Sequence, residues 1–274
     1  MSGTDHTRQR PARPSPVIVL VEPQLGENIG TAARAMANFA LQELRIVKPR
    51  DGWPSAPARK AASGADQVID DALLYDSCSE AVGDLNYVYA TTARPRGMVK
   101  SVITPEEAGI DIGARLALGQ KVGILFGRER FGLRNEEVAL ADVIVMAPVD
   151  PAFASLNVAQ AVLLMGYEWF KRSATSIGQA TPQEPAYAGS HVPLGGSQPA
   201  TKEELEGFFA QLKKELVDCG FLRPPEKAPS MMRNIRSLFL RAALTEQEVR
   251  TLRGIVSGLT YTHLRDQPGD GIGR

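Results

Sequence analysis

Residues 17–30 read Val-Ile-Val-Leu-Val-Glu-Pro-Gln-Leu-Gly-Glu-Asn-Ile-Gly, an apolar run followed by a polar turn. The run at 17–21 is mostly β-branched and does not alternate with polar residues, which is typical of a strand buried on both faces. Small and apolar residues then recur at helical spacing over 29–39. A buried strand followed closely by a helix indicates an α/β fold.

The same alternation continues along the chain. We predict further strands at 44–47, 87–90, 122–126 and 143–146. Helical patterns occupy 77–82, 105–118, 135–140 and the stretch from Ser155 through Phe170. Strands that alternate with helices predict a parallel sheet with helices on both faces.

The remaining segments differ in composition. Residues 1–16 combine arginines and prolines without an apolar stretch, which predicts a disordered basic tail rather than a signal peptide or membrane anchor. Residues 173–200 are rich in Pro, Gly and Ser, which predicts a flexible linker after a domain at 17–172. A helical extension follows at 201–265, with a tail at 266–274.

The extension contains three helical patterns, beginning near Thr201, Ser230 and Glu246. Thr201-Lys202-Glu203-Glu204 predicts a capping box, and apolar residues recur on one face of the first helix. So small a unit buries little surface by itself. We therefore expect it to dock on the first domain or to dimerise.

Composition excludes several classes of protein. Lys+Arg and Asp+Glu are equal at 31 each, so nucleic-acid binding must come from local patches rather than from net charge. Cys78 and Cys219 are too few and too distant for a disulfide framework, which favours a reducing cytoplasm. The three histidines are scattered, so we predict no metal site, and no stretch is long enough to span a membrane.

Common nucleotide and hydrolase motifs are also missing. The turn after Val21 is not G-x-G-x-x-G, so a dinucleotide site or an ordinary Rossmann methyltransferase loses its main support. Gly127 and Gly132 have phosphate-loop spacing, but Leu133 and Arg134 stand where Lys and Ser/Thr are needed. No serine lies in G-x-S-x-G, so the sequence offers no hydrolase nucleophile.

Three segments place polar side chains beside small residues at the ends of apolar runs: 27–36 (Glu-Asn-Ile-Gly-Thr-Ala-Ala-Arg-Ala-Met), 126–133 (Phe-Gly-Arg-Glu-Arg-Phe-Gly-Leu) and 155–161 (Ser-Leu-Asn-Val-Ala-Gln-Ala). Open α/β sheets bind ligands at the carboxyl ends of their strands, where the last two segments fall. We expect the helix start in the first segment to bind a phosphate anion.

Individual residues in these segments also have simpler interpretations. Asn28 and Ser155 are suited to cap the helices that follow them. By its position alone, Arg34 is expected to be a solvated arginine on the helix surface. The small neighbours Gly30, Thr31 and Ala35, however, are expected to leave room for a ligand around its guanidinium. The charges at 128–130 are suited to local ion pairs, with Phe131 and Leu133 packed down as anchors.

In this order and at this spacing, the three segments resemble motifs one, two and three of the SPOUT class, the trefoil-knotted RNA ribose 2′-O-methyltransferases. The resemblance covers roughly 17–172. Within the class, the loop at 91–94, the segment 126–130 and the helical extension favour the bacterial tRNA (cytidine/uridine-2′-O-)-methyltransferases. The resemblance implies a deep knot in the C-terminal half of the sheet, S-adenosylmethionine as methyl donor and an obligate homodimer.

The resemblance also assigns residues. It implies a functional polar set of Asn28, Arg34, Glu129, Ser155 and Asn157. It implies donor contacts from Thr91, Thr92, Ala93, Gly127, Ala147, Ala154, Ser155 and Leu156. One departure is Ala40, where many relatives have glycine after the first helix; it affects a helix end rather than the chemistry.

The implied reaction is attack of a ribose 2′-oxygen on the donor methyl group, at nucleotide 32 of the tRNA anticodon loop. Because a guanidinium stays protonated, we expect Arg34 to pair with a phosphate and stabilise the developing alkoxide rather than to act as a base. Ribosomal RNA as substrate, or a catalytically silent RNA-binding dimer, remain alternatives.

Further RNA contacts are expected from Arg233, Arg236 and Arg241 in the second helix of the extension. Helical spacing there puts an apolar set on the buried side: Met231, Ile235, Leu238, Phe239 and Ala242. The alternative is an ordinary solvated helix face, and the sequence does not decide between the two.

Overall fold

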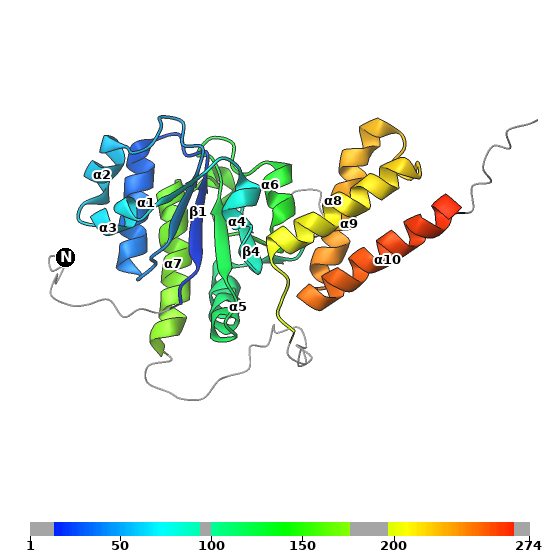
Figure 1. The fold of residues 1–274 in the computed structure, drawn as a ribbon. Coiled ribbons are helices and arrows are strands. Elements are labelled where there is room, and N and C mark those ends of the chain that lie inside the picture. Colours follow the sequence, from blue (N-terminus) through cyan, green and yellow to red (C-terminus); the bar gives the residue numbers. More distant parts are fainter. Residues whose placement is uncertain (1–13, 94–99, 176–196, 266–274) are drawn as a thin grey trace, which may run out of the picture.

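The computed structural model describes residues 14–93, 100–175 and 197–265 (Figure 1). Within these residues, seven parallel strands form one sheet in the order β3-β2-β1-β6-β4-β7-β5. The strands are β1 Val17–Val21, β2 Leu44–Val47, β3 Leu73–Tyr75, β4 Tyr87–Thr91, β5 Val102–Ile103, β6 Val122–Phe126 and β7 Val143–Val145.

The five strands predicted from apolar runs are confirmed to within one residue at their ends. The prediction missed β3 and β5, which lie at the two edges of the sheet. Leu73, Leu74 and Val102 in these strands are about half exposed. An edge strand of two or three residues buries too little to leave a continuous apolar signal in the sequence.

Helices cover both faces of the sheet, as the sequence predicted (Figure 1). One face packs against α1 Gly26–Asn38, α5 Pro105–Ala117 and α7 Val158–Thr175. The other packs against α4 Cys78–Val82 and α6 Asn135–Leu140. Two short helices that were not predicted, α2 Ala56–Ala62 and α3 Asp66–Asp70, pack on the outside of α1.

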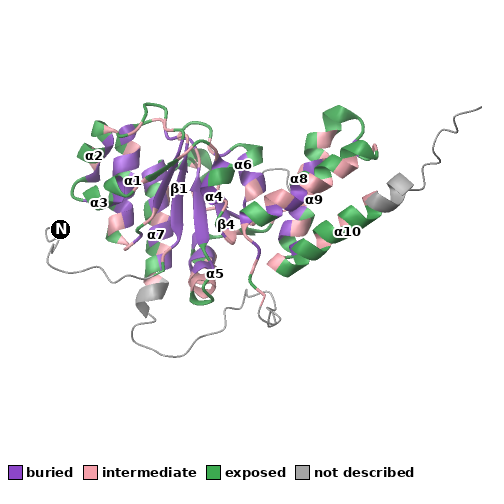
Figure 2. Ribbon diagram, in the orientation of Figure 1, coloured by how far each residue is buried: buried purple, intermediate pink, exposed green. Residues whose placement is uncertain are grey.

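β1 shows why the apolar runs do not alternate with polar residues. Ile18 and Leu20 contribute to the core beneath α1 and α7, whereas Val17, Val19 and Val21 contribute to the core beneath α4 and α6. All five are buried, and Figure 2 shows the central strands as continuously buried. A strand with period two needs apolar residues at every position when both of its faces are covered.

The strand order places two late strands between earlier ones. β6 lies between β1 and β4, and β7 lies between β4 and β5, although each follows both of its neighbours in the chain. This late insertion is consistent with the knotted topology that the resemblance implies. It also places β4 between β6 and β7, so the loops that follow these three strands leave the same edge of the sheet side by side.

The C-terminal helices are α8 Lys202–Asp218, α9 Ala228–Arg241 and α10 Glu246–Arg265, with a short 3₁₀ turn, η2 Pro225–Lys227, before α9. The capping box predicted at Thr201 is confirmed. These helices have their own small core, in which Phe208 and Phe209 lie within 6.2 Å of the Phe239 ring centroid. The predicted tails and most of the predicted linker lie outside the described residues.

The expectation that this unit docks or dimerises is met by docking through the start of α8. The Lys202 ammonium lies 2.6 Å from the Asp142 carboxylate, and the two side chains are only 4% and 7% exposed. The backbone N–H groups of Lys202 and Glu203 donate to the carbonyls of Leu85 and Gly83. A buried pair of this kind is costly to break on one side only, so it fixes the start of α8 on the sheet domain.

The predicted buried face of α9 is partly wrong. Leu238 and Ala242 are exposed, whereas Met232, Ser237 and Leu240 are buried. The reason is that α9 packs against two partners, α6 and the Phe208–Phe209 cluster, so its buried face is not a single apolar stripe.

The small residues of α1 also serve a purpose that the sequence did not reveal. Gly30 is buried against α2, where an added Cβ would overlap the Ala58 carbonyl oxygen and lie 2.8 Å from the Ala61 Cβ. The expectation that Gly30 leaves room for a ligand around Arg34 is therefore wrong. At the other end of α1, Ala40 has φ +54°, so the departure from glycine does fall on a helix end.

Gly30→Ala is expected to lower the free energy of unfolding by about 1–3 kcal/mol, because the methyl group has no space between α1 and α2. Chemical denaturation measures the change. Gly113→Ala on α5 is the matched control, since nothing lies within 4 Å of its added Cβ. That control should be neutral or stabilising by up to about 1 kcal/mol. Equal effects at both sites would contradict tight α1–α2 packing.

Candidate active site

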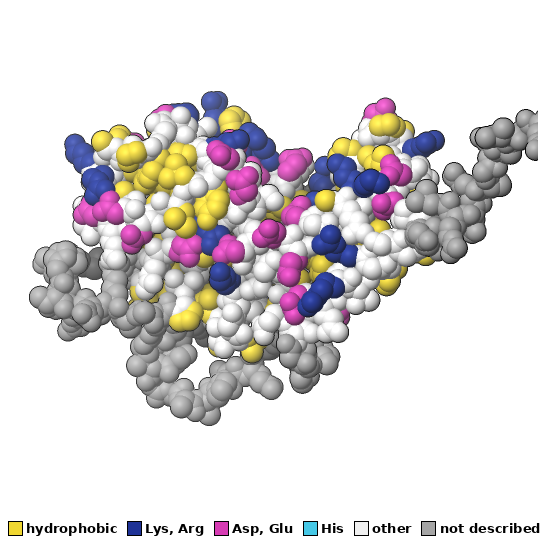
Figure 3. Space-filling view, viewed as in Figure 1, with side chains coloured by type: hydrophobic (Ala, Val, Ile, Leu, Met, Phe, Trp, Pro, Cys, Tyr) yellow, Lys and Arg dark blue, Asp and Glu magenta, His cyan; other side chains and the backbone are white. Residues whose placement is uncertain are grey.

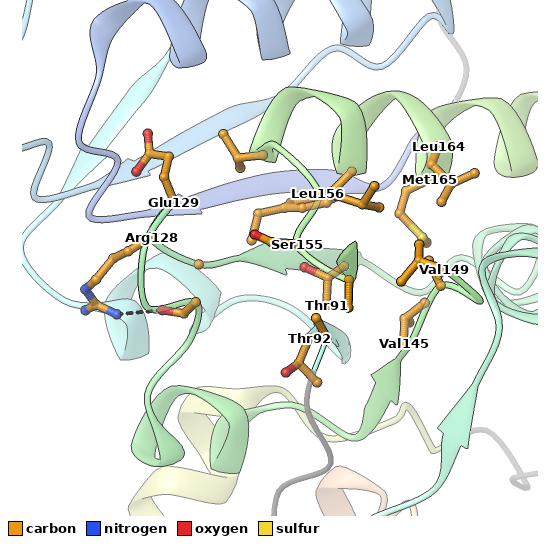
Figure 4. Close-up of a pocket in the computed structure, with 18 of the residues that line it drawn as sticks. Thr91, Thr92, Arg128, Glu129, Val145, Val149, Ser155, Leu156, Leu164 and Met165 are labelled. Carbon is orange, nitrogen blue, oxygen red and sulfur yellow. Dashed lines mark hydrogen bonds between the residues drawn. The ribbon is translucent and has the colours of Figure 1, made fainter. Parts of the chain in front are cut away.

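The loops after β4, β6 and β7 enclose a cavity of about 380 Å³ together with the start of α7 (Figure 4). Its size is typical of a small-molecule site. The structure brings together around it all eight residues to which the resemblance assigns the donor: Thr91, Thr92, Ala93, Gly127, Ala147, Ala154, Ser155 and Leu156.

The cavity lining is mostly small or apolar. Val145, Leu156, Leu164 and Met165 form an apolar wall, and Figure 4 shows their side chains grouped opposite Glu129. The Thr91 hydroxyl donates to the Leu125 carbonyl at 2.8 Å, so it is engaged within the sheet. Such a lining suits a ligand with a flat, weakly polar ring and polar ends.

The loop after β6 is a tight turn closed on itself. The Arg128 N–H donates to the Gly132 carbonyl at 3.3 Å, and the Gly132 N–H donates back to the Arg128 carbonyl at 2.8 Å. Gly132 has φ +66°, a backbone conformation that favours glycine. Gly127 touches the backbone of Gly132 and Leu133 so closely that a Cβ would overlap it. This wall of the cavity therefore depends on two glycines.

Arg128 fixes the turn from beneath. Its buried guanidinium lies 2.6 Å from the Glu22 carboxylate and 2.7 Å from the Glu137 carboxylate, and it also donates to the Gly132 carbonyl. The hydrogen bond from Arg128 lowers the pKa of Glu22. Figure 4 shows the guanidinium directed away from Thr91 and Ser155. The ion-pair interpretation of this charge is therefore confirmed.

Glu129, next along the turn, points to the start of α1. Its carboxylate accepts the N–H groups of Gln24 at 2.9 Å and Leu25 at 3.3 Å, and the Asn28 side-chain amide at 2.9 Å. The Gln24 and Leu25 N–H groups, just before α1, are thus occupied by the protein's own carboxylate, whereas phosphate binding at the first turn of α1 stays a prediction. Asn28 does not cap the helix, because the N-cap position is Leu25.

Asn157 completes this network. Its side-chain Nδ2 donates to Asn28 Oδ1 at 2.9 Å, while its Oδ1 accepts the Ala159 N–H at 2.8 Å. The Gln160 side chain accepts the Asn157 N–H. Asn157, rather than Ser155, therefore caps α7, and Ser155 is left exposed at the cavity. Glu129, Asn28 and Asn157 form a continuous hydrogen-bonded chain, called the Glu129 network below, that joins all three motifs.

Arg34 stands apart from this network. It is exposed on α1, and it makes no hydrogen bond or ion pair with any residue in the described part of the chain. A protonated guanidinium without an internal partner is available to an external anion.

The extension arginines differ from one another. Arg236 pairs with Glu206 and lies over the Phe209 ring at 4.7 Å, so much of its charge is compensated internally. Arg233 lies 4.0 Å from Glu136, and Arg241 is exposed. On the face in Figure 3, basic and acidic side chains are intermixed rather than gathered in one basic band.

Some features escaped the sequence analysis. Phe131 was expected to pack down, but it is 68% exposed at the cavity rim, whereas Leu133 is buried as predicted. The sequence held a signal for the capping role of Asn157, because Asn157 and Gln160 have the spacing of a capping box.

Burial raises the pKa of the Cys78 thiol to about 12, so this thiol is not a nucleophile at neutral pH.

The described residues provide neither a metal site nor a membrane-spanning helix. No group of three or more His, Cys, Asp or Glu side chains in the described ranges is arranged to hold a metal ion. Likewise, none of the described helices has the length and apolar character needed to cross a membrane.

The interleaved parallel sheet and the three-loop cavity define an α/β protein of the SPOUT class. Comparison with family models agrees with this assignment. The chain belongs to the SpoU rRNA Methylase family, whose model matches residues 15–167. Residues 203–268 match a second model, described as the C-terminal domain of the tRNA methyltransferase TrmJ.

Similar proteins extend over most of the chain. It is 35% identical over 91% of its length to the tRNA (cytidine/uridine/adenosine-2′-O-)-methyltransferase TrmJ of Pseudomonas aeruginosa, 98% of which is covered. It is also 35% identical over 90% of its length to the tRNA (cytidine/uridine-2′-O-)-methyltransferase TrmJ of Pectobacterium atrosepticum, 97% of which is covered. The crystal structure of TrmJ from Z. mobilis superposes with a TM-score of 0.78 at 46% identity, covering 90% of this chain and 99% of that one.

Glu129→Gln is expected to lower the free energy of unfolding by about 1–3 kcal/mol, because one accepting carboxylate oxygen becomes an NH₂ group that cannot accept from the N–H donors it faces. Urea denaturation measures the change in the free energy of unfolding. Glu136→Gln is the matched control, since Glu136 is exposed on α6 and its ion pair among the described residues is the 4.0 Å contact with Arg233. That variant should stay within about 0.5 kcal/mol of wild type. A neutral Glu129→Gln would show that the network does not hold the loops together.

Proposed function

We propose that this protein transfers a methyl group from S-adenosylmethionine to a ribose 2′-hydroxyl of tRNA. The observation that carries the proposal is the Glu129 network at the edge of the three-loop cavity. It places one polar residue from each motif, Asn28, Glu129 and Asn157, beside a cavity lined by small residues. A protein that only bound RNA would have no need for such a cavity.

The residues of the cavity fit the donor in size and chemistry. Small side chains, among them Ala93, Gly127, Ala147 and Ala154, leave backbone groups accessible to a ligand, and the apolar wall at Leu156 and Leu164 suits an adenine ring. The chemistry that S-adenosylmethionine supplies when bound is a methyl group on a positively charged sulfur with a good leaving group.

The protein's own part is to align the acceptor and to stabilise charge. The Glu129 network holds three loops in fixed positions, which lowers the entropic cost of bringing the two reactants together. Arg34 pairs with a phosphate next to the acceptor ribose and stabilises the negative charge that develops on the 2′-oxygen. Because its guanidinium stays protonated, the hydroxyl proton passes to solvent or to a relay rather than to Arg34.

The RNA is tRNA rather than ribosomal RNA, because the C-terminal unit matches the TrmJ C-terminal model. Cytidine or uridine at position 32 of the anticodon loop is the proposed nucleotide, with the reaction in the cytoplasm. The family description keeps ribosomal RNA as the second candidate substrate. Transfer of labelled methyl groups into unmodified tRNA transcripts and into ribosomal RNA distinguishes the two; label in ribosomal RNA alone would overturn the tRNA assignment.

We also propose that the active form is a homodimer. Leu163, Tyr167 and Phe170 are exposed on one side of α7 at helical spacing, and Phe39 packs edge-on against Tyr167. We call these four residues the α7 face. A contiguous exposed apolar face of this kind marks a contact with another protein, and a second copy is the occupant proposed here.

Arg34→Lys is expected to reduce methyl transfer to tRNA at least about tenfold, because the ammonium keeps the charge but not the two-pronged geometry of the guanidinium. The turnover number with labelled donor is the measurement. Arg59→Lys, on an exposed helix of the same domain, is the control and should transfer normally. Near-normal turnover of Arg34→Lys would exclude a bidentate role.

Leu163→Glu is expected to convert the dimer to a monomer, because it buries a charge in an apolar contact. Light scattering after gel filtration gives the mass directly. Leu118→Glu is the control, since Leu118 is also exposed but lies at the end of α5. A Leu163→Glu protein with the mass of wild type would place any dimer contact elsewhere.

A further inference from the structure

Two exposed phenylalanines belong to the loops that form the cavity. Phe131 lines the cavity and is 68% exposed, and Phe153, in the 3₁₀ turn η1 Pro151–Phe153, is 81% exposed beside the cavity residue Ala154. Exposed aromatic rings are unfavourable in water unless a ligand covers them. The mechanism above uses neither of them.

Both rings are held outward by hydrogen-bonded turns. Phe131 stands at the tip of the turn closed by Arg128 and Gly132, which is fixed from beneath by the buried Arg128 ion pairs. The Phe153 N–H donates to the Asp150 carbonyl, and the Asp150 side chain accepts the Ala152 N–H. Rings presented in this way lose little conformational entropy when a ligand packs on them.

A cation accompanies the Phe131 ring. The Arg130 guanidinium is exposed and lies 5.6 Å from the ring centroid. An aromatic face beside a guanidinium matches a nucleotide, whose base stacks on the ring while its phosphate pairs with the cation. The pairing is local, and the chain as a whole has no net charge.

We propose that Phe131, with Arg130 beside it, is a stacking site for an RNA base adjacent to the methylated nucleotide; this rests on the proposed function. The acceptor ribose must reach the mouth of the cavity, so the neighbouring nucleotides lie against its rim. Stacking supplies affinity that does not depend on net charge. It thereby explains how a neutral protein without a continuous basic band on the face in Figure 3 holds its RNA.

A partner protomer is the less suitable occupant of this site. The sequence neighbours of Phe131 are Arg130 and Gly132, and Glu129 precedes them, so the turn offers no continuous apolar patch. The α7 face, in contrast, is such a patch. A ring flanked by charged residues in its own turn is better matched to a base than to a protein surface.

Binding of an unmodified tRNA transcript to the full-length protein tests the site. Phe131→Leu keeps an apolar side chain but loses the aromatic face, and it should weaken binding about tenfold. The slope of affinity against salt should not change, because stacking releases no counterions, whereas Arg130→Gln should reduce that slope. Phe131→Trp should bind like wild type, with indole fluorescence quenched when RNA is added.

Phe221→Leu is the matched control, because Phe221 is 57% exposed but lies between α8 and η2, outside the cavity; it should bind as wild type does. Wild-type affinity in Phe131→Leu would overturn the stacking site. Loss of the dimer in RNA-free Phe131→Leu would also overturn it, in favour of a protein contact. If the wild-type protein methylates no RNA, the proposed function fails as well; if it does and Phe131→Leu binds normally, only this inference fails.

Discussion

The position of one carboxylate determines how the three loops of the site are arranged. Glu129 leaves the end of β6, reaches the start of α1 and accepts two backbone N–H groups and the Asn28 amide there. Asn28 in turn accepts from Asn157 at the start of α7. An anion at a helix amino terminus is favourable both as a hydrogen-bond acceptor and as a partner of the helix dipole. Segments more than 100 residues apart in sequence are therefore fixed to one another.

The same carboxylate changes how the site is understood. The Gln24 and Leu25 N–H groups before α1 are already occupied from within, and Arg34, which has no partner among the described residues, is the side chain that we propose for phosphate recognition. The side chains of Asn28 and Asn157 are hydrogen-bonded to each other. The polar set of the motifs thus contains two groups: a network that positions the loops, and exposed side chains at the cavity or on α1 that are free to meet RNA.

Sequence patterns were most reliable where burial is complete. The central strands and their covering helices were predicted because continuous apolar runs and helical periodicity follow directly from burial on both faces. Edge strands β3 and β5 were missed because their side chains are half exposed and carry no such pattern. The buried face of α9 was partly misassigned because two different partners cover that helix. Phe131 was expected to be buried because it is apolar and lies close in sequence to the buried Leu133, and nothing in the sequence shows that its side chain points outward.

By itself, the sequence determined the α/β class and the order of the motifs, because these depend on local composition and on the ends of buried strands, whereas the residues around the cavity came from the resemblance that the motifs carry. Only the tertiary structure decided which partner each polar side chain takes. The late insertion of β6 and β7 between earlier strands makes neighbours of loops that are distant in the chain. A hydrogen bond such as that from Asn157 to Asn28 spans 129 residues, and no local pattern encodes a contact set by the strand order of the whole sheet.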